Sequence, residues 1–297
     1  MGSPRPLVSY LLLTLGVVAC AMSVLMLKAS HTHPFWLSGA RLLIAAAALS
    51  PLYWIEAKKT PQSPRIVLKS WPGAIVLVAH FVTWTLGARW TEAANGTLIV
   101  NLAPVVMPFV MFLFNGERVN RGEIIGTIPS IAGVLLLVSS HVSVDMKYAS
   151  GDAMCFVSMV LFCFYLALGR RMGAGRSLWL YVVPLYAIAG VTCWATALAT
   201  LTPLPQLNQR EILLLLGLGL IPTVIGHSIM NWCIQHLRGQ VVSVANLGQF
   251  VVAGVIAVFQ FGEVPTLAFY VASVLIIAGS VIVIRSNRVS VDIDAES

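Results

Sequence analysis

The residues of this chain best suited to chemistry are a few polar and aromatic side chains set into long apolar segments. His80 and Trp84 lie one helical turn apart, so they share a helix face that offers an ionisable imidazole beside a broad aromatic surface. An ionisable group inside an apolar segment is costly, so this pair is a candidate for lining a substrate cavity. The structural alternative is a neutral histidine that hydrogen-bonds between helices and a tryptophan that packs.

A second polar stripe is formed by His227, Asn231 and Gln235 at four-residue spacing. On an otherwise apolar helix such a stripe faces inward, either to hydrogen-bond other helices or to bind a substrate, and the sequence leaves both roles open. Three further candidates for the same site, for which packing or helix contacts are the alternative, are Tyr165, Asn246 and Gln249.

Two prolines mark a third candidate feature. Thr97, Asn101, Pro104 and Pro108 recur at spacings of four, three and four, which places them on one helix face. Proline removes a backbone donor, so Pro104 would free the carbonyl of Val100, and Pro108 would free that of Pro104. Free carbonyls at membrane depth face protein or a water-filled cavity. The pattern predicts an inward kink that gates the site, and the alternative is a bend without ligand contact.

Charged residues are rare within the apolar segments. Arg41 lies near the end of its segment, so we expect its side chain to reach the lipid headgroups; the alternative is pairing with a substrate carboxylate. Glu117 and Glu263 fall at segment ends, where a capping or loop-fixing role is expected. Because no Asp or Glu lies deep in any segment, coupling to protons would have to use His80 or His227.

Composition sets the class of protein that must position these residues. The chain has 297 residues, of which 58% are hydrophobic and 10% charged, and these values are typical of an integral membrane protein. Its net charge of +7 is explained by membrane orientation and anionic headgroups, and no nucleic-acid partner is expected. The five cysteines are read as small buried hydrophobes. The first apolar run is expected to be a helix and not a removed signal.

Ten apolar segments are each long enough to cross a bilayer, which takes about 20 residues. We expect spans at 7–27, 35–55, 71–90, 95–114, 122–140, 150–169, 178–201, 211–233, 240–261 and 265–285. With the N-terminus inside, most of the 18 lysines and arginines fall on the cytoplasmic side. The sequence therefore predicts a multi-pass protein of the cell (inner) membrane with both termini in the cytoplasm.

The second half of the chain repeats the first at an offset of 146 residues. Gly116-Glu117 followed by Ile131-Ala132-Gly133 returns as Gly262-Glu263 followed by Ile277-Ala278-Gly279, and the same offset aligns Asn231 with Thr85, a further candidate substrate contact. Because each half holds five helices, an odd number, the two halves must be inverted in the membrane. We expect an all-α fold with units at 1–145 and 146–287 and a short cytoplasmic tail at 288–297.

These motifs resemble a known family. The run from Thr97 to Val138, which carries the Asn, Pro, Gly-Glu and Ile-Ala-Gly residues quoted above, resembles the signature of the EamA domain of the drug/metabolite transporter superfamily. The resemblance implies ten helices in two five-helix units and a central cavity lined by the third, fourth, eighth and ninth helices, with help from the first and sixth. One departure is Phe250, which stands where the first repeat has Pro104.

Enzyme motifs are missing from the sequence. It has no GxSxG, HExxH, Walker loop or intramembrane Asp pair, and neither a cofactor nor a metal is expected. We expect a secondary transporter that moves a small neutral or zwitterionic metabolite, amino acids among them, by alternating access, and the resemblance favours export. A drug or nucleotide-sugar substrate is an alternative within transport, and a non-transporting scaffold or sensor is the alternative outside it. One chain supplies both repeats, so we expect that a monomer can function, and the sequence leaves a dimer open.

Overall fold

The structure is a computed structural model that describes residues 6–61, 63, 67–91, 96, 99–138, 148–261 and 267–295. Within these residues the chain is helical and contains no strand. Its helices are α1 (Pro6–Ala29), α2 (Pro34–Lys59), α4 (Trp71–Trp90), α6 (Ala103–Asn115), α7 (Arg121–Val138), α8 (Ala149–Gly173), α9 (Leu178–Ala199), α10 (Gln209–Leu218), η2 (Gly219–His227), α11 (Ser228–His236), α12 (Gly239–Asn246), α13 (Gly248–Phe261) and α14 (Leu267–Ala295).

Seven helical stretches in the described part of the chain are long and apolar enough to cross a membrane. They comprise α1, α2, α4, α8, α9, the continuous stretch Gln209–His236 and residues 267–287 of α14. Two further apolar helical stretches, Ala103–Asn115 and Gly239–Val252, are shorter. The expected segments thus appear as helices, but three of them are interrupted.

The three interruptions differ in form. In the segment expected at 95–114, a turn at Asn101 and Leu102 separates helical residues 99 and 100 from α6, which begins at Ala103. The segment expected at 211–233 contains a π-helical stretch, η2, with Pro222 inside it. The segment expected at 240–261 breaks at Leu247, which separates α12 from α13. Hydropathy is unchanged across these breaks, so the apolar pattern alone predicts continuous spans.

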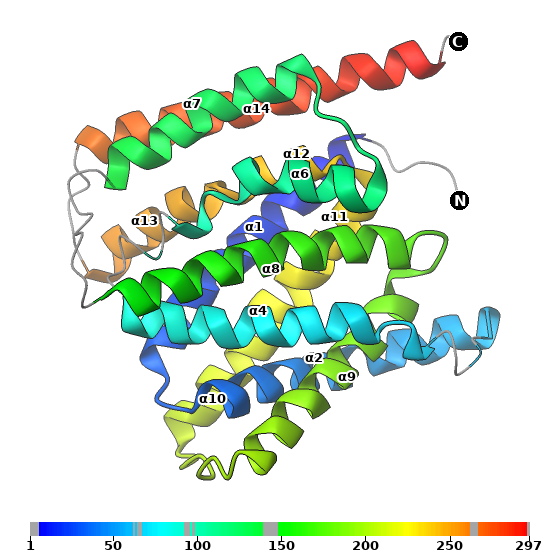
Figure 1. Cartoon of the computed structure of the whole chain (residues 1–297), viewed down its shortest axis with the longest axis vertical. Helices are drawn as coiled ribbons and strands as arrows, with labels where there is room; N and C mark the ends of the chain where they lie inside the picture. Colours follow the sequence, from blue (N-terminus) through cyan, green and yellow to red (C-terminus); the bar gives the residue numbers. More distant parts are fainter. Residues whose placement is uncertain are drawn as a thin grey trace.

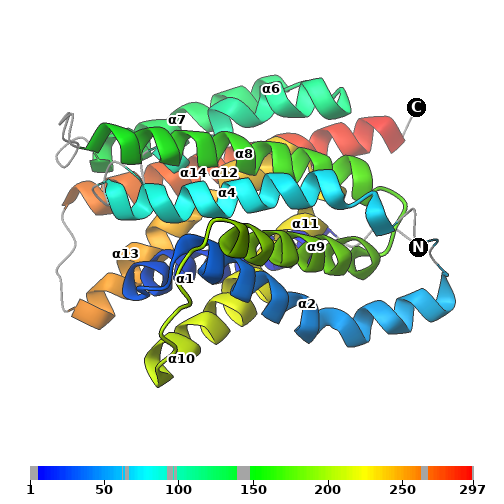
Figure 2. The same ribbon diagram turned by 60° about the horizontal axis from the view of Figure 1, so that its bottom comes forward.

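Helices from the two halves of the sequence pack side by side. Residues of α7 contact α14, those of α4 contact α8, and those of α2 contact α9. Figure 1 shows α7 along α14 at the top of the molecule, and α4 lies along α8 in both views (Figure 1 and Figure 2). The α7 and α14 backbones approach closely at Gly126, where a Cβ atom would lie 2.6 Å from the carbonyl oxygen of Gly279. Small residues allow such contact between membrane helices.

The bundle has two ends, at which different connections lie. Helix α1 begins and α14 ends on the same side of the molecule, the right side of Figure 1. We call this the basic end; it carries the connections 116–120, 174–177 and 237–238. The other end, which we call the Glu211 end, carries the connections 30–33 and 200–208. The helices between them position the polar residues in the middle of the bundle.

The outer surface of the helices is strongly apolar. Phe109, Leu113 and Val274 expose 73%, 72% and 66% of their surfaces. Soluble monomers rarely expose large contiguous apolar areas, whereas lipid tails solvate such side chains. The described helices therefore have the surface of a multi-pass membrane protein.

Candidate functional site

The middle of the bundle holds a layer of aromatic and polar side chains around His227. The His227 ring lies 4.9 Å from the Phe81 ring, 6.0 Å from that of Tyr165, and 6.3 Å from those of His80 and Phe162 (centroid distances). All five residues are buried. Together with two polar neighbours described below they form what we call the central cluster, defined as Arg41, His80, Phe81, Phe162, Tyr165, His227 and Asn231.

His80 connects α4 to α8. Its Nδ1 atom lies 2.9 Å from both the carbonyl oxygen and the hydroxyl of Ser158. The Ser158 hydroxyl is also placed to donate to the carbonyl oxygen of His80, at 3.1 Å. The histidine thus has the interhelical bonding that the sequence offered as the structural alternative, while its ring still faces the central cluster.

Asn231 places an amide beside Tyr165. Its Nδ2 group donates to the Tyr165 hydroxyl and, at 2.8 Å, to the carbonyl oxygen of His227. Its Oδ1 atom is buried and has no hydrogen-bond partner. Gly169 makes room for this oxygen, since a Cβ atom at that position would lie 2.7 Å from it. The predicted residues His80, Tyr165, His227 and Asn231 therefore come together.

Arg41 lies in the same layer, and the expectation that it reaches the headgroups is wrong. Only 1% of its surface is exposed. Its Nε donates to the Thr223 hydroxyl at 2.9 Å, its Nη1 lies 3.4 Å from the Ser23 hydroxyl, and its guanidinium carbon lies 4.1 Å from the Phe81 ring centroid. Arg41 is the eighth residue of α2, or about 10 Å along the helix axis, and it faces the protein interior.

The surroundings of Arg41 compensate its charge incompletely. None of the ion pairs among the described residues involves Arg41, and its Nη2 atom has no partner. A desolvated cation–π contact contributes about 2 kcal/mol. Removing an ion from water costs several kcal/mol even after relaxation. The unliganded layer therefore retains an excess of positive charge.

The π-helical stretch η2 supplies the partner of Arg41. Thr223 and His227 are both buried residues of this stretch, and both lie against residues of the first half of the chain. The Thr223 hydroxyl donates to the carbonyl oxygen of Leu218, five residues earlier, which leaves its lone pairs for Arg41. Single π turns inside α-helices are frequent at functional sites.

Other buried polar atoms without partners continue from Asn231 toward the basic end. They are the hydroxyl of Tyr181, Nε2 of Gln235 and Nη1 of Arg176. Tyr181 and Gln235 flank α8, since Cβ atoms at Gly169 and Gly173 would lie 3.8 Å from the Tyr181 hydroxyl and 2.2 Å from Gln235 Nε2. Buried polar atoms in proteins are usually hydrogen-bonded, so a run of unpartnered atoms in one region is unusual.

Two predicted site residues of α4, Trp84 and Thr85, are not members of the central cluster. Trp84 is half-buried, one turn beyond His80. Thr85 is buried, but its hydroxyl donates to the carbonyl oxygen of Phe81 at 2.8 Å, within its own helix. This bond leaves the hydroxyl with only its acceptor capacity for a ligand.

The prolines act differently from the predicted kink. Pro104 lies in the first turn of α6, where a missing N–H is no defect, so it begins this helix and does not bend one. Pro108 lies inside α6 and leaves the carbonyl of Pro104 without its usual intrahelical donor. Gln240 of α12 replaces that donor, with Nε2 at 3.0 Å from the oxygen. Asn101 is buried in the turn before α6, and Thr97 lies outside the described residues.

Asn246 and Gln249 pair with each other at the junction of α12 and α13. Gln249 Nε2 donates to Asn246 Oδ1, and the intervening Leu247 is buried against Val134 and Ile276 of α7 and α14. The structure therefore places this pair near α7 and α14, and no hydrogen bond among the described residues joins it to the central cluster.

Charged groups at the two ends are matched. At the basic end Glu117 accepts from Arg170 and from the backbone N–H of Gly239 (2.9 Å), which agrees with its expected loop-fixing role. Glu123 is fully buried and accepts from Nε and Nη2 of Arg238, at 2.5 and 3.0 Å. These bonds raise the pKa of Arg238. Glu263 lies outside the described residues.

At the opposite end Glu211 holds the connection between α1 and α2. It accepts from the hydroxyls of Ser30 (2.6 Å) and Thr32 (2.8 Å) and from the backbone N–H of His31 (3.0 Å). Arg89 Nη2 donates to the carbonyl oxygens of Ser30 and Thr32, both at 2.9 Å. Each end is therefore tied by a carboxylate of one half of the chain and donors of the other half.

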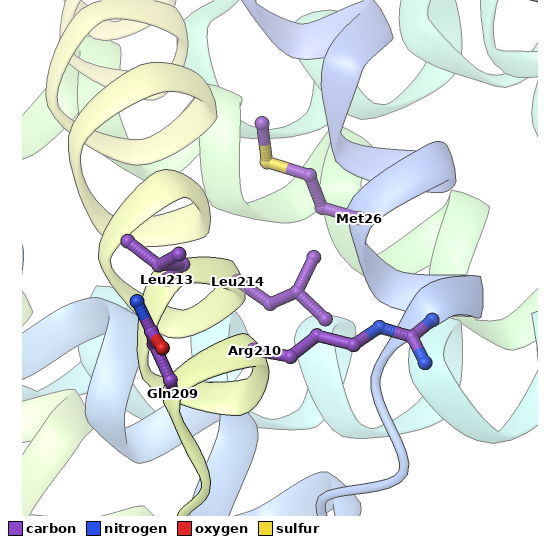
Figure 3. Close-up of a pocket in the computed structure, with 5 residues that line it drawn as sticks. All are labelled: Met26, Gln209, Arg210, Leu213 and Leu214. Carbon is purple, nitrogen blue, oxygen red and sulfur yellow. The ribbon is translucent and has the colours of Figure 1, made fainter.

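A surface pocket of about 360 Å³ lies away from the central cluster, between α1 and α10. It is lined by Met26, Gln209, Arg210, Leu213 and Leu214 (Figure 3). A second hollow, of about 10 Å³, lies near Glu117 and Gln240. All seven residues of the central cluster are buried, and none of them lines either of these two hollows. In the described part of the chain, no group of His, Cys, Asp and Glu residues is arranged to hold a metal ion.

The sequence missed four residues of this region: Arg41, Phe81 and Phe162 of the central cluster, and Thr223, the partner of Arg41. One signal for Arg41 was available, since it is an arginine inside a segment that otherwise contains no charge until Glu56. Its direction depends on how α2 is rotated against η2 and α9, and hydropathy does not contain that information.

Comparison with known proteins indicates a family of membrane transporters. The model of the EamA-like transporter family matches residues 7–139 and 149–285. The uncharacterized transporter YdfC of Bacillus subtilis (strain 168) is 23% identical over 254 residues, 80% of this chain and 78% of that protein. An uncharacterized transporter of Archaeoglobus fulgidus is 23% identical over 200 residues, 66% of this chain and 68% of that protein.

A solved structure shares the fold. A crystal structure with 15% sequence identity superposes with a TM-score of 0.79 over 94% of this chain and 98% of that one. The two family matches cover most of the chain, and they confirm the resemblance inferred from the Gly-Glu and Ile-Ala-Gly motifs. The chain is a multi-pass membrane protein that belongs to the EamA-like transporter family.

Proposed function

We propose that the protein is a secondary transporter that carries a small organic metabolite through the central cluster by alternating access. The observation that carries this proposal is the layer of buried polar atoms without partners in the middle of a bundle whose two ends are closed. Polar and ionisable groups at membrane depth are costly and mark substrate pathways. A scaffold would have no need for such a layer.

The proposal includes ten membrane crossings in two inverted five-helix units, 1–145 and 146–287, followed by the tail 288–297. It is supported by the separate family matches to the two halves and by both chain ends lying on one side of the bundle. Transporters of this kind hold their substrate near the midplane, where the repeats meet. The basic end would face the cytoplasm of a cell (inner) membrane, because its connections carry Arg118, Arg176 and Arg238, and Arg170 lies in the last turn of α8.

The carboxylate contacts at the two ends of the bundle are compatible with alternating access. Release of the Glu117 and Glu123 contacts would open the basic end, whereas release of the Glu211 contacts would open the other. The unpartnered atoms of Tyr181, Gln235 and Arg176 would line the route from Asn231 toward the basic end. Any proton carried with the substrate would reside on His80 or His227, the two imidazoles of the central cluster.

The proposed substrate is a small neutral or zwitterionic metabolite, and export is the proposed direction. The test is counterflow into proteoliposomes that contain the purified protein, with a panel of radiolabelled amino acids, organic acids and nucleosides and with protein-free liposomes as the blank. We expect at least one compound to accumulate. The Asn231→Ala variant should lower that flux at least tenfold, whereas Asn115→Ala should retain it, since Asn115 bonds Ala167 outside the central cluster.

The outcome that contradicts the proposal is equally specific. If no compound of the panel shows counterflow, and Asn231→Ala behaves as the unmodified protein in ligand-binding assays, then the scaffold or sensor alternative holds.

A further inference from the structure

The central cluster contains one full positive charge that its surroundings do not match. Arg41 is 1% exposed, and every ion pair among the described residues involves other cations. Its polar partners are the neutral hydroxyls of Thr223 and Ser23. At the two ends, by contrast, Glu117, Glu123 and Glu211 are each engaged by donors of the other half. The carboxylates at the two ends therefore have their donors, whereas the Arg41 cation in the central cluster has no anionic partner.

The ring of Phe81 partly compensates the charge of the Arg41 guanidinium. The face of an aromatic ring carries partial negative charge, and the Phe81 ring centroid lies 4.1 Å from the guanidinium carbon. The same ring meets His227 in an edge arrangement with centroids 4.9 Å apart. Arg41 and His227 thus flank one side chain, and each has a buried nitrogen without a partner, Nη2 in Arg41 and Nδ1 in His227.

Two unpartnered nitrogens around one ring suit the two oxygens of a carboxylate. A guanidinium presents parallel donors that match carboxylate geometry, and such charge-assisted bonds are stronger than neutral ones. The Nδ1 atom of His227 donates as well when it carries the proton. A cationic ligand would be repelled by Arg41. A phosphate dianion would keep an unmatched negative charge, because Arg41 is the one arginine or lysine of the central cluster.

The remaining unpartnered atoms of the layer describe the rest of the ligand. Asn231 Oδ1 and the Tyr181 hydroxyl are buried acceptors on α11 and α9, on the side of α8 that carries Gly169. They would accept hydrogen bonds from an amino or hydroxyl group. Phe162 and Phe81 offer apolar surface beside His80 and His227.

We propose that Arg41 binds the carboxylate of the transported substrate, with His227 Nδ1 as a second donor. The inference rests on the transporter proposal and specifies a substrate that carries one carboxylate. Zwitterionic amino acids fall within the class proposed above, and simple organic acids extend that class to monoanions. Arg41 is then the specificity-determining residue of the central cluster.

The test is ligand binding to the purified full-length protein in detergent, measured as a shift of its melting temperature. The probes are matched pairs of an acid and its amide, such as phenylalanine with phenylalaninamide and hexanoate with hexanamide, extended over amino, hydroxy, aliphatic and aromatic acids. A ligand that binds the folded state raises the melting temperature. We expect members of the acid series, and not their amides, to do so. The amino acid and simple acid arms show which source of carboxylate is preferred.

Variants then assign the effect to Arg41. Arg41→Gln should weaken acid binding at least a hundredfold, and Arg41→Lys, which keeps the charge but loses the planar fork, should weaken it about tenfold. Arg210→Gln is the matched control, since Arg210 lies on the surface near Ala29, and it should bind acids unchanged. If Arg41→Gln does not fold, Thr223→Val takes its place, because it removes the acceptor that orients Arg41 and should weaken acid binding severalfold.

Two results overturn the inference. The first is equal stabilisation by acids and amides, which includes no stabilisation by either. The second is acid binding that survives unchanged in Arg41→Gln or, where that variant does not fold, in Thr223→Val. Counterflow separates the two proposals. Flux of a compound without a carboxylate, unaffected by Arg41→Gln, removes the Arg41 inference and keeps the transporter. Acid binding that depends on Arg41 but is never accompanied by flux keeps the site and removes transport.

Discussion

The middle of the bundle and its two ends treat buried charge in opposite ways. At the ends, Glu123 and Glu211 are nearly inaccessible and each accepts several short hydrogen bonds from the other half of the chain. In the middle, Arg41 is as deeply buried but has only two hydroxyls and a ring around it. All three charged side chains are buried, but the two glutamates have strong hydrogen-bond donors, whereas Arg41 has no counter-charge.

This difference separates groups that hold the protein closed from groups that are kept available. A satisfied buried pair is strongly destabilising to break. A buried charge without its counter-charge lowers the stability of the unliganded protein, which is the usual cost of a binding site. The comparison therefore predicts opposite signs for substitutions in the two regions.

The largest effect is expected from Glu123→Ala at the basic end. The change leaves Arg238 without its buried partner and should lower the stability by about 3 kcal/mol, seen as a clear fall in melting temperature. The double variant with Arg238→Ala should recover part of the loss, because no charge is then left unpaired. A melting temperature equal to that of the unmodified protein would show that this end is not held by its ion pairs.

A smaller loss is expected from Glu211→Gln at the other end. Glutamine keeps the size but loses the charge and one acceptor oxygen, so the Ser30 and Thr32 contacts weaken by about 1.5–3 kcal/mol in total. Thermal unfolding measures the loss, and Ser30→Ala, which removes a single bond, should cost less. If Ser30→Ala were the more damaging change, Glu211 would not be the centre of this tie.

The opposite sign is expected from Arg41→Met in the central cluster. Methionine keeps apolar contact with Phe81 and removes the unmatched charge, so stability without ligand should rise by about 1 kcal/mol. Arg89→Met is the matched control and should lower stability, since Arg89 donates to two loop carbonyls. Destabilisation by both changes would erase the distinction between the middle and the ends.

The smallest effect concerns His33, which precedes α2 at the Glu211 end. Desolvation, followed by the nearby charge of Arg89, lowers the pKa of His33. A histidine with a depressed folded-state pKa binds fewer protons folded than unfolded, so stability falls as the pH drops through and below about 6.5. Because this side chain is exposed, the loss should stay well under 1 kcal/mol. In His33→Asn, which keeps a capping side chain, this part of the pH dependence of the melting temperature should disappear; an unchanged profile would assign it elsewhere.

The helices were largely predictable because apolar length is a strong signal. The span expected at 71–90 matches α4, and the motifs around Gly116-Glu117 identified the family correctly. The interruptions at Leu102 and Leu247 and the π-helical stretch were not predictable from hydropathy. Pro104 shows why, since a proline inside an apolar run can begin a helix as well as bend one.

The site was predictable in its chemistry more than in its geometry. His80, Tyr165, His227 and Asn231 were chosen as polar or aromatic residues on inward faces, and they lie together. Asn246 and Gln249 satisfied the same criterion but pair with each other elsewhere. Arg41 was assigned to the headgroups, because distance from the end of a segment does not reveal how a helix is rotated. That rotation is set by packing between distant segments.

The carboxylate contacts at both ends also bear on how measured affinities are interpreted. In the proposed mechanism a ligand reaches Arg41 only in the fraction of molecules that have one end released, so the observed dissociation constant would equal the intrinsic one divided by that fraction. If one molecule in about a hundred is open, a micromolar site registers near a tenth of a millimolar. A substitution that weakens the carboxylate contacts at one end should therefore lower the observed dissociation constant and speed association, even though it leaves the contacts to the ligand unchanged.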